Sequence, residues 1–388
     1  MADYTLTVPV ERRPKEHAVV TITTEDGKQF VHWLSANIKL SMENISRVAT
    51  IPVALIPGHP PEIGRQDKVT VKVGDTQLMS GIVLATGPLY RYDDAGWKVA
   101  VRDLTGDLIK ASALHKGGQW RNVKIDVIIT DIIKPFGLKL RVLDDVGAAL
   151  KEFKLEHGET CLDACARAAR KRGMLVTSNA QGEVVLCKAG KEKAVGSIVR
   201  GDNVIEMEDI GTDEDRAGEY IAYGQSEVAD DFETCRQKKA KASDKEIKRY
   251  LPILVSADSK TSQADLQQLV DHQMRVRRGH AYGLRYKVDG WLTLGKAWDI
   301  NQRIPIYDDI AGLNGEEWLI AEIEYNVDVK DGDYRMVTVR PIEAYEPEPE
   351  IERHKSGKAK KGGKNSAGKA KGKDGKALTQ QAYYTPSK

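Results

Sequence analysis

Long apolar stretches are missing from this sequence of 388 residues, 41% of which are hydrophobic. No stretch approaches the roughly 18 consecutive apolar residues of a membrane-spanning helix, so we expect no membrane insertion. The first residues, Met1 to Thr5, bring neither a basic start nor an apolar segment, so we expect no secretory signal peptide. The apolar fraction still allows sizeable cores, and the length favours about two to three domains.

Cysteine and histidine are also scarce, with four and eight residues. Four cysteines are too few for a disulfide scaffold and form no Cys-x-x-Cys pair, which favours a reducing compartment. The sequence has no Gly-x-Ser-x-Gly and no His-Glu-x-x-His motif, and Gly190-Lys191 lacks the upstream glycine of a phosphate-binding loop. These absences argue against an enzyme, so we expect no catalytic residue and no cofactor.

The net charge of +2 hides an uneven distribution. Residues 353–388 contain ten Lys and one Arg against one Asp, a net charge of +10, so residues 1–352 must carry −8. The Lys- and Gly-rich tail has few side chains to bury, so we expect it to be disordered when free. Its uncharged end, residues 377–385, contains two tyrosines, and we predict that it docks on a partner.

The first hundred residues show the alternating and β-branched pattern of strands. Gly74-Asp75 predicts a hairpin turn, and the prolines near residue 52 confine that region to edges and loops. Many short strands separated by turns indicate a small barrel or a sandwich. The predicted strands are 18–23, 37–41, 52–56, 68–73, 76–84 and 97–102.

A mixed α+β region follows Asp103. A stripe of isoleucines predicts a helix over 123–134, which ends at Pro135-Phe136-Gly137. A second helix is predicted over 160–172, with Thr160 as its N-cap and Gly173 as its stop. The remaining elements predicted here are a strand at 139–143 and a hairpin of 174–177 with 184–187.

The β pattern returns after Gly201. Strands are predicted at 220–225, 284–288, 304–307, 318–325 and 334–340. A polar excursion from 226 to 282 interrupts them and contains a predicted helix over 262–278, which is typical of a surface insertion. The acidic segment 346–350 marks the boundary before the tail.

One Cys/His cluster is a candidate zinc site. His157, Cys161 and Cys165 are spaced to share one helix face, and Cys187 lies in the hairpin expected to pack on that helix. The same two helix cysteines lie among leucine and alanine on the face that must be buried, where free cysteine behaves as a small hydrophobic residue. We expect core packing and no metal ligand, and the zinc alternative calls for a metal measurement.

Two acidic clusters are candidate calcium sites. They are Asp213-Glu214-Asp215 and the turn formed by Asp328, Asp331 and Asp333. Neither has the ligand order of an EF-hand loop, so we interpret both as solvated carboxylates.

Six segments carry motifs that occur together over about residues 5–347. They are Arg102 to Ile109, Glu159 to Thr177, Gly201 to Ile205, Trp291 with Trp298 to Asp308, Trp318 to Ile320, and Pro341 to Tyr345. Their order and spacing resemble the Mu-type phage baseplate hub proteins, the tail protein P or late-control D-like family. The sequence departs from the family's Phe-x-Leu pattern at Ile51 to Leu55. Cys161 and Cys165 stand where the family has plain apolar residues, which favours the core interpretation.

The resemblance implies a mainly β fold with α+β parts, in which two small tube-like β-barrel domains flank an α+β middle domain. The expected domains are a first barrel at 1–104, the middle domain at 105–199, and a second barrel split into 200–227 and 283–346. A helix-bearing insertion fills 228–282, and the acidic boundary and Lys/Gly-rich tail fill 347–388. Hubs of this kind are similar to the base of type VI secretion spike proteins.

The resemblance also implies a structural function without catalysis. A homotrimer would join a hexameric tail tube to a trimeric central spike, contact baseplate wedge proteins, and form a collar through which DNA passes without specific binding. The chain would lie in the virion baseplate and in the host cytoplasm during assembly. Since residues 1–352 are acidic, we expect an acidic or neutral channel wall, along which DNA slides. The alternatives are a spike-associated cell-wall hydrolase, or a nucleic-acid-binding module acting through the basic tail.

Overall fold

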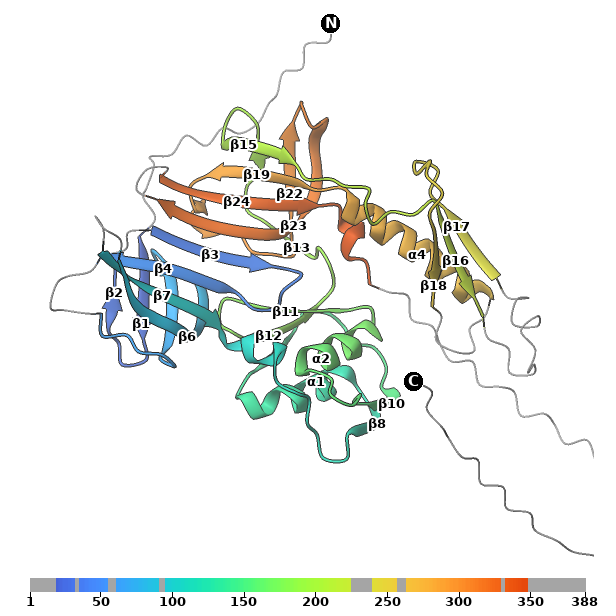
Figure 1. Ribbon diagram of the computed structural model, residues 1–388, viewed down its shortest axis with the longest axis horizontal. Coiled ribbons are helices and arrows are strands. Elements are labelled where there is room, and N and C mark those ends of the chain that lie inside the picture. The colour runs from blue at the N-terminus through green and yellow to red at the C-terminus, as the bar shows by residue number, and fades with distance from the viewer. Residues whose placement is uncertain are drawn as a thin grey trace, which may run out of the picture. The chain divides into compact units, whose positions relative to one another are not determined.

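The computed structural model describes residues 19–31, 35–54, 61–90, 95–224, 239–256, 263–328 and 332–347 (Figure 1). The predictions for the basic tail, for its docking segment 377–385 and for Asp331 lie outside these residues, as does the fourth cysteine, Cys235. They remain predictions.

Most strands belong to one 14-stranded sheet (Figure 1). Its N-terminal strands are β1 (Val20–Thr24), β2 (Gln29–Phe30), β3 (Ser35–Ser41), β4 (Val48–Ala54), β5 (Lys68–Val73), β6 (Thr76–Tyr90) and β7 (Ala95–Asp103). Its C-terminal strands are β13 (Glu192–Lys193), β14 (Ile198–Val199), β15 (Val204–Asp209), β19 (Leu284–Asp289), β22 (Gln302–Asp308), β23 (Leu313–Asp328) and β24 (Gly332–Arg340). The order is β15-β19-β24-β23-β3-β4-β7-β6-β5-β1-β2, with β22 paired to β23 and β13 and β14 paired to β22.

The mainly β fold is confirmed, but the two β regions do not form two separate barrels. β3 and β23 pair antiparallel, with Ser41 opposite Glu322 and Ser35 opposite Asp328, so the first region continues directly into the second. No closed barrel is found in the part of the chain that the structure describes. The pairing satisfies the free backbone groups of two edge strands at once, which explains why the sheet is continuous.

The large sheet contains the same five-stranded arrangement twice. β3-β4-β7-β6-β5 in the first region and β15-β19-β24-β23-β22 in the second have the same chain order, and all their pairings are antiparallel. β-Bulges fall at Leu78 and Leu84 in β6, and with the same spacing at Gly315 and Ala321 in β23. Because bulges are specific structural features, their repetition shows that the two units are built alike.

One continuous hydrophobic core joins both units. It contains buried side chains of both regions, among them Ile38 and Val71 of the first and Tyr286, Ile304 and Tyr325 of the second. Burial alternates along β5, β19 and β22, as expected for strands with one face on a core. The two units are therefore held together by apolar packing as well as by strand pairing.

The predicted α+β middle region is present and has its own core. Its helices are α1 (Ile125–Ile133) and α2 (Cys161–Arg170), with 3₁₀ helices η1 (Leu104–Ile109) and η2 (Lys134–Phe136). Its strands are β8 (Gln119–Val123), β9 (Leu140–Val142), β10 (Leu150–Lys154), β11 (Leu175–Ser178) and β12 (Val184–Cys187). The Thr160 hydroxyl accepts a 3.1 Å hydrogen bond from the Asp163 N–H, and Gly173 has φ +61°, so both predicted helix ends are confirmed.

The excursion after β15 forms a small layer of its own. Strands β16 (Glu219–Tyr223), β17 (Lys239–Ser243) and β18 (Pro252–Val255) form a three-stranded sheet, and α4 (Gln263–Ala281) packs on it (Figure 1). The strand predicted at 220–225 was expected in the second barrel, but this prediction is wrong, because β16 pairs with β17 and β18 instead. Its buried Tyr220 and Ala222 need an apolar partner, and Leu266 and Val270 of α4 supply it.

The last described elements connect this layer back to the large sheet. They are β20 (Leu292–Thr293), β21 (Lys296–Ala297) and the 3₁₀ helix η3 (Ile342–Tyr345). α4 lies so close to η3 that a methyl group at Gly279 would meet the Ala344 backbone N at 2.5 Å, so only glycine fits there. Among the described residues, no helix combines the length and the apolar character needed to cross a membrane.

Candidate functional site

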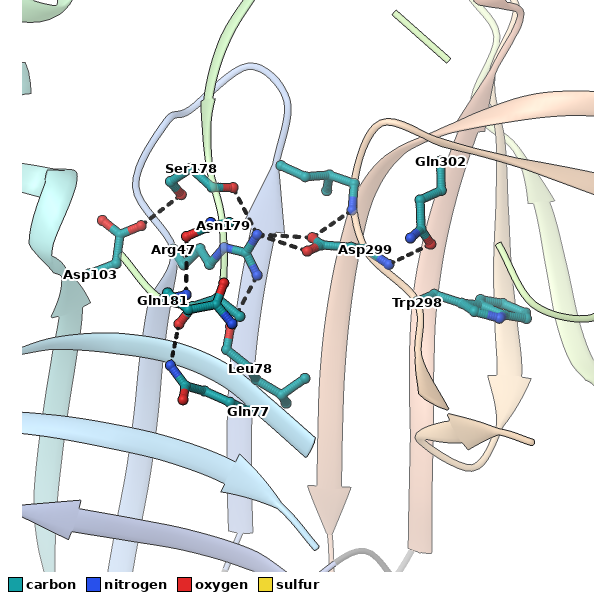
Figure 2. Close-up of polar contacts among 12 residues, drawn as sticks. Arg47, Gln77, Leu78, Asp103, Ser178, Asn179, Gln181, Trp298, Asp299 and Gln302 are labelled. Atoms are coloured by element: carbon teal, nitrogen blue, oxygen red, sulfur yellow. Dashed lines mark hydrogen bonds and ion pairs between the residues drawn. The ribbon is translucent and has the colours of Figure 1, made fainter. Parts of the chain in front are cut away.

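A buried polar cluster joins the first β region, the middle region and the second β region (Figure 2). At its centre is Arg47, which precedes β4 and is 2% exposed. Its Nη1 donates to the Leu78 carbonyl at 3.0 Å, and its Nη2 donates to the Ser178 carbonyl at 2.8 Å and to the Asp299 carboxylate at 3.0 Å. The rigid fork of an arginine side chain therefore contacts all three regions at once.

Asp103, at the end of β7, holds the second part of the cluster and is buried. Its Oδ1 accepts hydrogen bonds from the Thr105 N–H at 3.1 Å and the Thr105 hydroxyl at 2.7 Å, which caps η1. Its Oδ2 lies 2.8 Å from the Ser178 hydroxyl of β11. A methyl group at Gly106 would lie 2.1 Å from the Arg102 Cδ atom, so a larger residue there would force the Arg102 side chain to move. The segment from Arg102 to Ile109 thus joins the first β region to the middle region.

The second β region brings Asp299 to the cluster in a fixed orientation. Its Oδ1 accepts the Ile300 N–H at 2.8 Å, while its own N–H donates to Gln302 Oε1 at 3.0 Å (Figure 2). The preceding residue, Trp298, is buried, and its indole N–H donates to the Val195 carbonyl at 2.7 Å. These contacts leave the carboxylate facing Arg47, so the ion pair needs little further ordering.

A second buried arginine packs against the segment that contains Trp298 and Asp299. Arg335 of β24 lies 3.6 Å from the centroid of the Trp298 ring and donates to the Trp291 carbonyl at 3.2 Å and to the Thr293 hydroxyl at 2.8 Å. Burial lowers the pKa of its guanidinium to about 10, which still leaves it charged near neutral pH. Its charge is stabilised by the ring face and by oxygen acceptors, and it positions Trp298 next to Asp299.

Two further contacts tie the middle region to its neighbours. Gln77 of β6 donates through Nε2 to the Ala180 carbonyl at 2.7 Å. Asn301, which has φ +64°, donates to the Lys188 carbonyl at 3.0 Å, and its Oδ1 accepts the Gly190 N–H at 2.8 Å. The hairpin of β11 and β12 is therefore held by the first unit on one side and by the second on the other.

The contacts of this cluster are those of a structural site that connects three regions of the chain. Its charged groups form hydrogen bonds to backbone carbonyls, caps and each other, and of the Arg47 nitrogens only Nε has no partner among the described residues. What the arrangement does is fix the orientation of three regions relative to one another within one chain.

The predicted Cys/His cluster does not come together as a ligand set. Cys161 and Cys165 of α2 are buried in the core of the middle region, which confirms the core-packing prediction, whereas His157 is exposed. Cys187 is also buried, and its Sγ lies 3.3 Å from Asn301 Nδ2. Burial raises the pKa of the Cys165 thiol, and burial together with Asp144 raises that of Cys187 to about 12. No group of three possible metal ligands occurs among the described residues.

The acidic segment 213–215 binds arginines. Arg216 is buried and donates to Asp213 at 2.8 Å, to Asp244 at 2.8 Å and to Glu246 at 2.6 Å. Desolvation opposes its charge, but these carboxylates raise its pKa overall. The segment thus anchors the small sheet, and Lys191, the other motif residue considered above, pairs with Asp144 at 2.7 Å.

Sequence reasoning did not find Arg47, Ser178 or Asp299 as partners. The only signal was indirect, because Asp103 and Asp299 lie within two of the segments that resemble the hub family. These segments lie where different regions of the fold contact one another. Residues 102–109 and 298–308 meet at the polar cluster. Tyr345 of η3, in a further such segment, packs edge-on against His280 of α4, with 5.1 Å between the ring centroids.

Comparisons with known proteins agree with this interpretation. The family model of the second domain of gp44-like baseplate hub proteins matches residues 105–188. The baseplate hub protein gp44 of Escherichia phage Mu is 29% identical over 354 residues, which cover 88% of this chain and 92% of that protein.

Two solved structures share the fold. The 43 kDa tail protein of prophage MuSo2 from Shewanella oneidensis is 28% identical with a TM-score of 0.73, over 84% of this chain and 100% of that one. The E. coli type VI secretion component c3393 has a TM-score of 0.51 at 10% identity, over 85% of this chain and 80% of that one, and shows the fold alone. The sequence, the middle region and the architecture all point the same way: over most of its length this chain is similar to the Mu-type phage baseplate hub proteins.

Proposed function

We propose that this baseplate hub protein works as a homotrimer that adapts the sixfold symmetry of the tail tube to the threefold symmetry of the central spike. The observation that carries the proposal is the repeated five-stranded unit within one chain. Three chains supply six such units, which matches a hexameric ring, while the rest of each chain occurs three times and matches a trimeric spike.

The proposed domains follow the repeat. The first unit takes residues 1–104 and the middle domain residues 105–199. The second unit takes residues 200–210 and 283–346, because β16 pairs within the small sheet and moves the excursion to 211–282. The polar cluster around Arg47 supports this division, since a collar under load needs its parts held in fixed orientations.

The proposed partners are the tail tube protein, the central spike and the baseplate wedge proteins, met in the host cytoplasm during assembly. DNA would pass through the collar without specific binding, because the net charge of −8 over residues 1–352 favours a wall that does not retain phosphates. A structural rather than catalytic role is supported by the way the buried charges of the described residues serve contacts between regions.

The test is the oligomeric state and symmetry of the purified full-length chain. Size-exclusion chromatography with light scattering is expected to give a trimer, alone or with the spike protein. Electron-microscope class averages should then show a threefold ring whose rim has six similar lobes. A chain that stays monomeric in both preparations would refute the adaptor proposal.

A further inference from the structure

The large sheet ends in a strand whose equivalent in the other unit is already paired. β15 is the edge strand of the sheet and bonds to β19 on one side, apart from a single bridge between Val204 and Arg200 (Figure 1). Its counterpart β3 pairs with β4 on that side and with β23 on the other. Among the residues that the structure describes, β15 therefore lacks the neighbour that β3 has.

A second strand, β6, has a described partner on only one side over half its length. β6 pairs with β5 only as far as Ile82, and beyond Val83 its described partner is β7 alone. Its counterpart β23 pairs over the equivalent stretch with both β24 and β3. The free stretch of β6 contains Pro88, and proline is confined to strand edges and bulges, which agrees with a free side within the monomer.

This free stretch is also unusually apolar for an exposed strand. Leu84 is 41% exposed, Leu89 49% and Tyr90 80%. On β15, Ile205 is 54% exposed. Exposed apolar strand edges invite pairing with another chain, and native proteins either cover them or use them.

From this repeat we infer that β15 of one chain pairs antiparallel with residues 84–90 of β6 in the next chain of the trimer. The pairing reproduces between chains the β3–β23 junction that already exists within each chain. The inference rests on the proposed trimer and names the strands that close it. Because the two surfaces differ, the contact is head-to-tail and can close into a ring of three.

The bulges fix the register. We align β6 with β23 so that its bulges at Leu78 and Leu84 match those at Gly315 and Ala321. In this alignment Leu89 corresponds to Asn326, and Tyr90 corresponds to Val327.

The pairings of β4 with β3 and of β19 with β15 show which residues of β15 correspond to those of β3. Ala49 and Leu284 occupy equivalent positions in β4 and β19, and Ile38 and Asp209 are their partners in β3 and β15. Glu208 then corresponds to Asn37, and Met207 to Ala36.

The residue pairs between chains follow from those within the chain. Asn37 lies opposite Asn326 and donates to its side chain at 2.7 Å, so Glu208 should lie opposite Leu89. Ala36 lies opposite Val327, so Met207 should lie opposite Tyr90. Ala36 is 2% exposed at the β3–β23 junction within the chain. The equivalent residue of β15, Met207, should be buried to a similar extent by β6 of the next chain.

Disulfide trapping tests the register. In a Cys235→Ser background, the double variant Leu89→Cys with Glu208→Cys should form covalent dimers and then trimers on mild oxidation, since directly opposed Cβ atoms lie about 4.5–5.5 Å apart. The control, Leu89→Cys with Thr212→Cys, moves the second thiol about 13 Å along the chain and should stay monomeric on denaturing gels. The other native cysteines are buried and should not interfere.

Charge substitution tests the surface. Tyr90→Glu would place a carboxylate against Met207 and should raise the dissociation constant of the trimer at least about tenfold. The matched control is Leu114→Glu in the middle region, where the native side chain is likewise 80% exposed. Both variants should leave the unfolding temperature of the monomer unchanged.

The outcomes separate this inference from the proposed function. A trimer by light scattering that neither forms the 89–208 cross-link nor responds to Tyr90→Glu overturns the strand pairing and leaves the adaptor proposal standing. A response to Tyr90→Glu with cross-linking of the control pair instead overturns the register. A chain that is monomeric alone and with the spike overturns both.

Discussion

Arg47 and Asp299 lie 252 residues apart in the sequence, yet Nη2 of Arg47 is 3.0 Å from both oxygens of the Asp299 carboxylate. The guanidinium is nearly fully buried, while the carboxylate side chain keeps 34% of its exposure, so water screens part of the attraction. The pair is supported by two backbone carbonyls that accept from the same guanidinium. It is the point at which the three regions of the chain meet.

Arg47→Ala should lower the free energy of unfolding by about 2–4 kcal/mol, because it leaves the Leu78 and Ser178 carbonyls and one carboxylate without their donor. Urea unfolding followed by circular dichroism measures this. The control is Lys68→Ala, whose partner Glu25 is exposed, and its cost should stay below about 1 kcal/mol. A double-mutant cycle with Asp299→Ala should give a coupling of about 1–3 kcal/mol. A coupling near zero would contradict the role assigned to the pair.

Asp103→Ala should cost about 2–4 kcal/mol, since it removes the cap of η1 and one of the two acceptors at the Ser178 hydroxyl, the other being the Ile45 carbonyl. Asp107→Ala, four residues along the same segment, is the matched control, because Asp107 is exposed and should cost less than about 0.5 kcal/mol. Thermal unfolding of the two variants makes the comparison. Equal losses would show that the segment matters through its helix and not through the Asp103 contacts.

His280 should make the protein less stable as the pH falls. Burial, and then the nearby Arg340, lowers the pKa of His280 in the folded chain below its ordinary value. The unfolded chain therefore binds the proton first, so the free energy of unfolding decreases as the pH falls through about 6.5. The decrease ends once the pH is below the pKa of the folded chain.

His280→Gln should flatten this pH dependence, and His157→Gln, at an exposed histidine, should leave it as it is. Urea unfolding at several values between about pH 5 and 7.5 measures the slopes. An unchanged slope in His280→Gln would assign the effect to another group.

The thiols of Cys161, Cys165 and Cys187 should react with a disulfide reagent roughly a hundredfold more slowly in the folded chain than in urea, because they are buried and their pKa values are raised. A Cys235→Ser variant removes the fourth thiol from the count. Native mass spectrometry of the same sample should find no bound zinc. One zinc per chain would contradict the interpretation of these cysteines as core residues.

The sequence by itself determined the local structure. Isoleucine spacing, the Thr160 cap and Gly173 predicted α1 and α2, and the Gly74-Asp75 turn predicted the β5–β6 hairpin. These signals are local, since a helix face, a cap or a tight turn is specified by residues within a few positions of one another. The strand patterns of the two β regions predicted the mainly β fold, whereas the separate barrels implied by the family resemblance are not found among the described residues.

Only the tertiary structure decided how the strands are shared. Tyr220 and its neighbours have the pattern of a strand in either sheet, and pairing with β17 and β18 under α4 settled the choice. Likewise, nothing near Asn37 or Asn326 specifies that β3 meets β23, because partners so distant in sequence are selected by which edges remain free and which apolar faces match. The contact between Arg47 and Asp299 could not be predicted for the same reason. Residue spacing specifies turns and helix or strand faces, whereas contacts across hundreds of residues exist only once the sheet has formed.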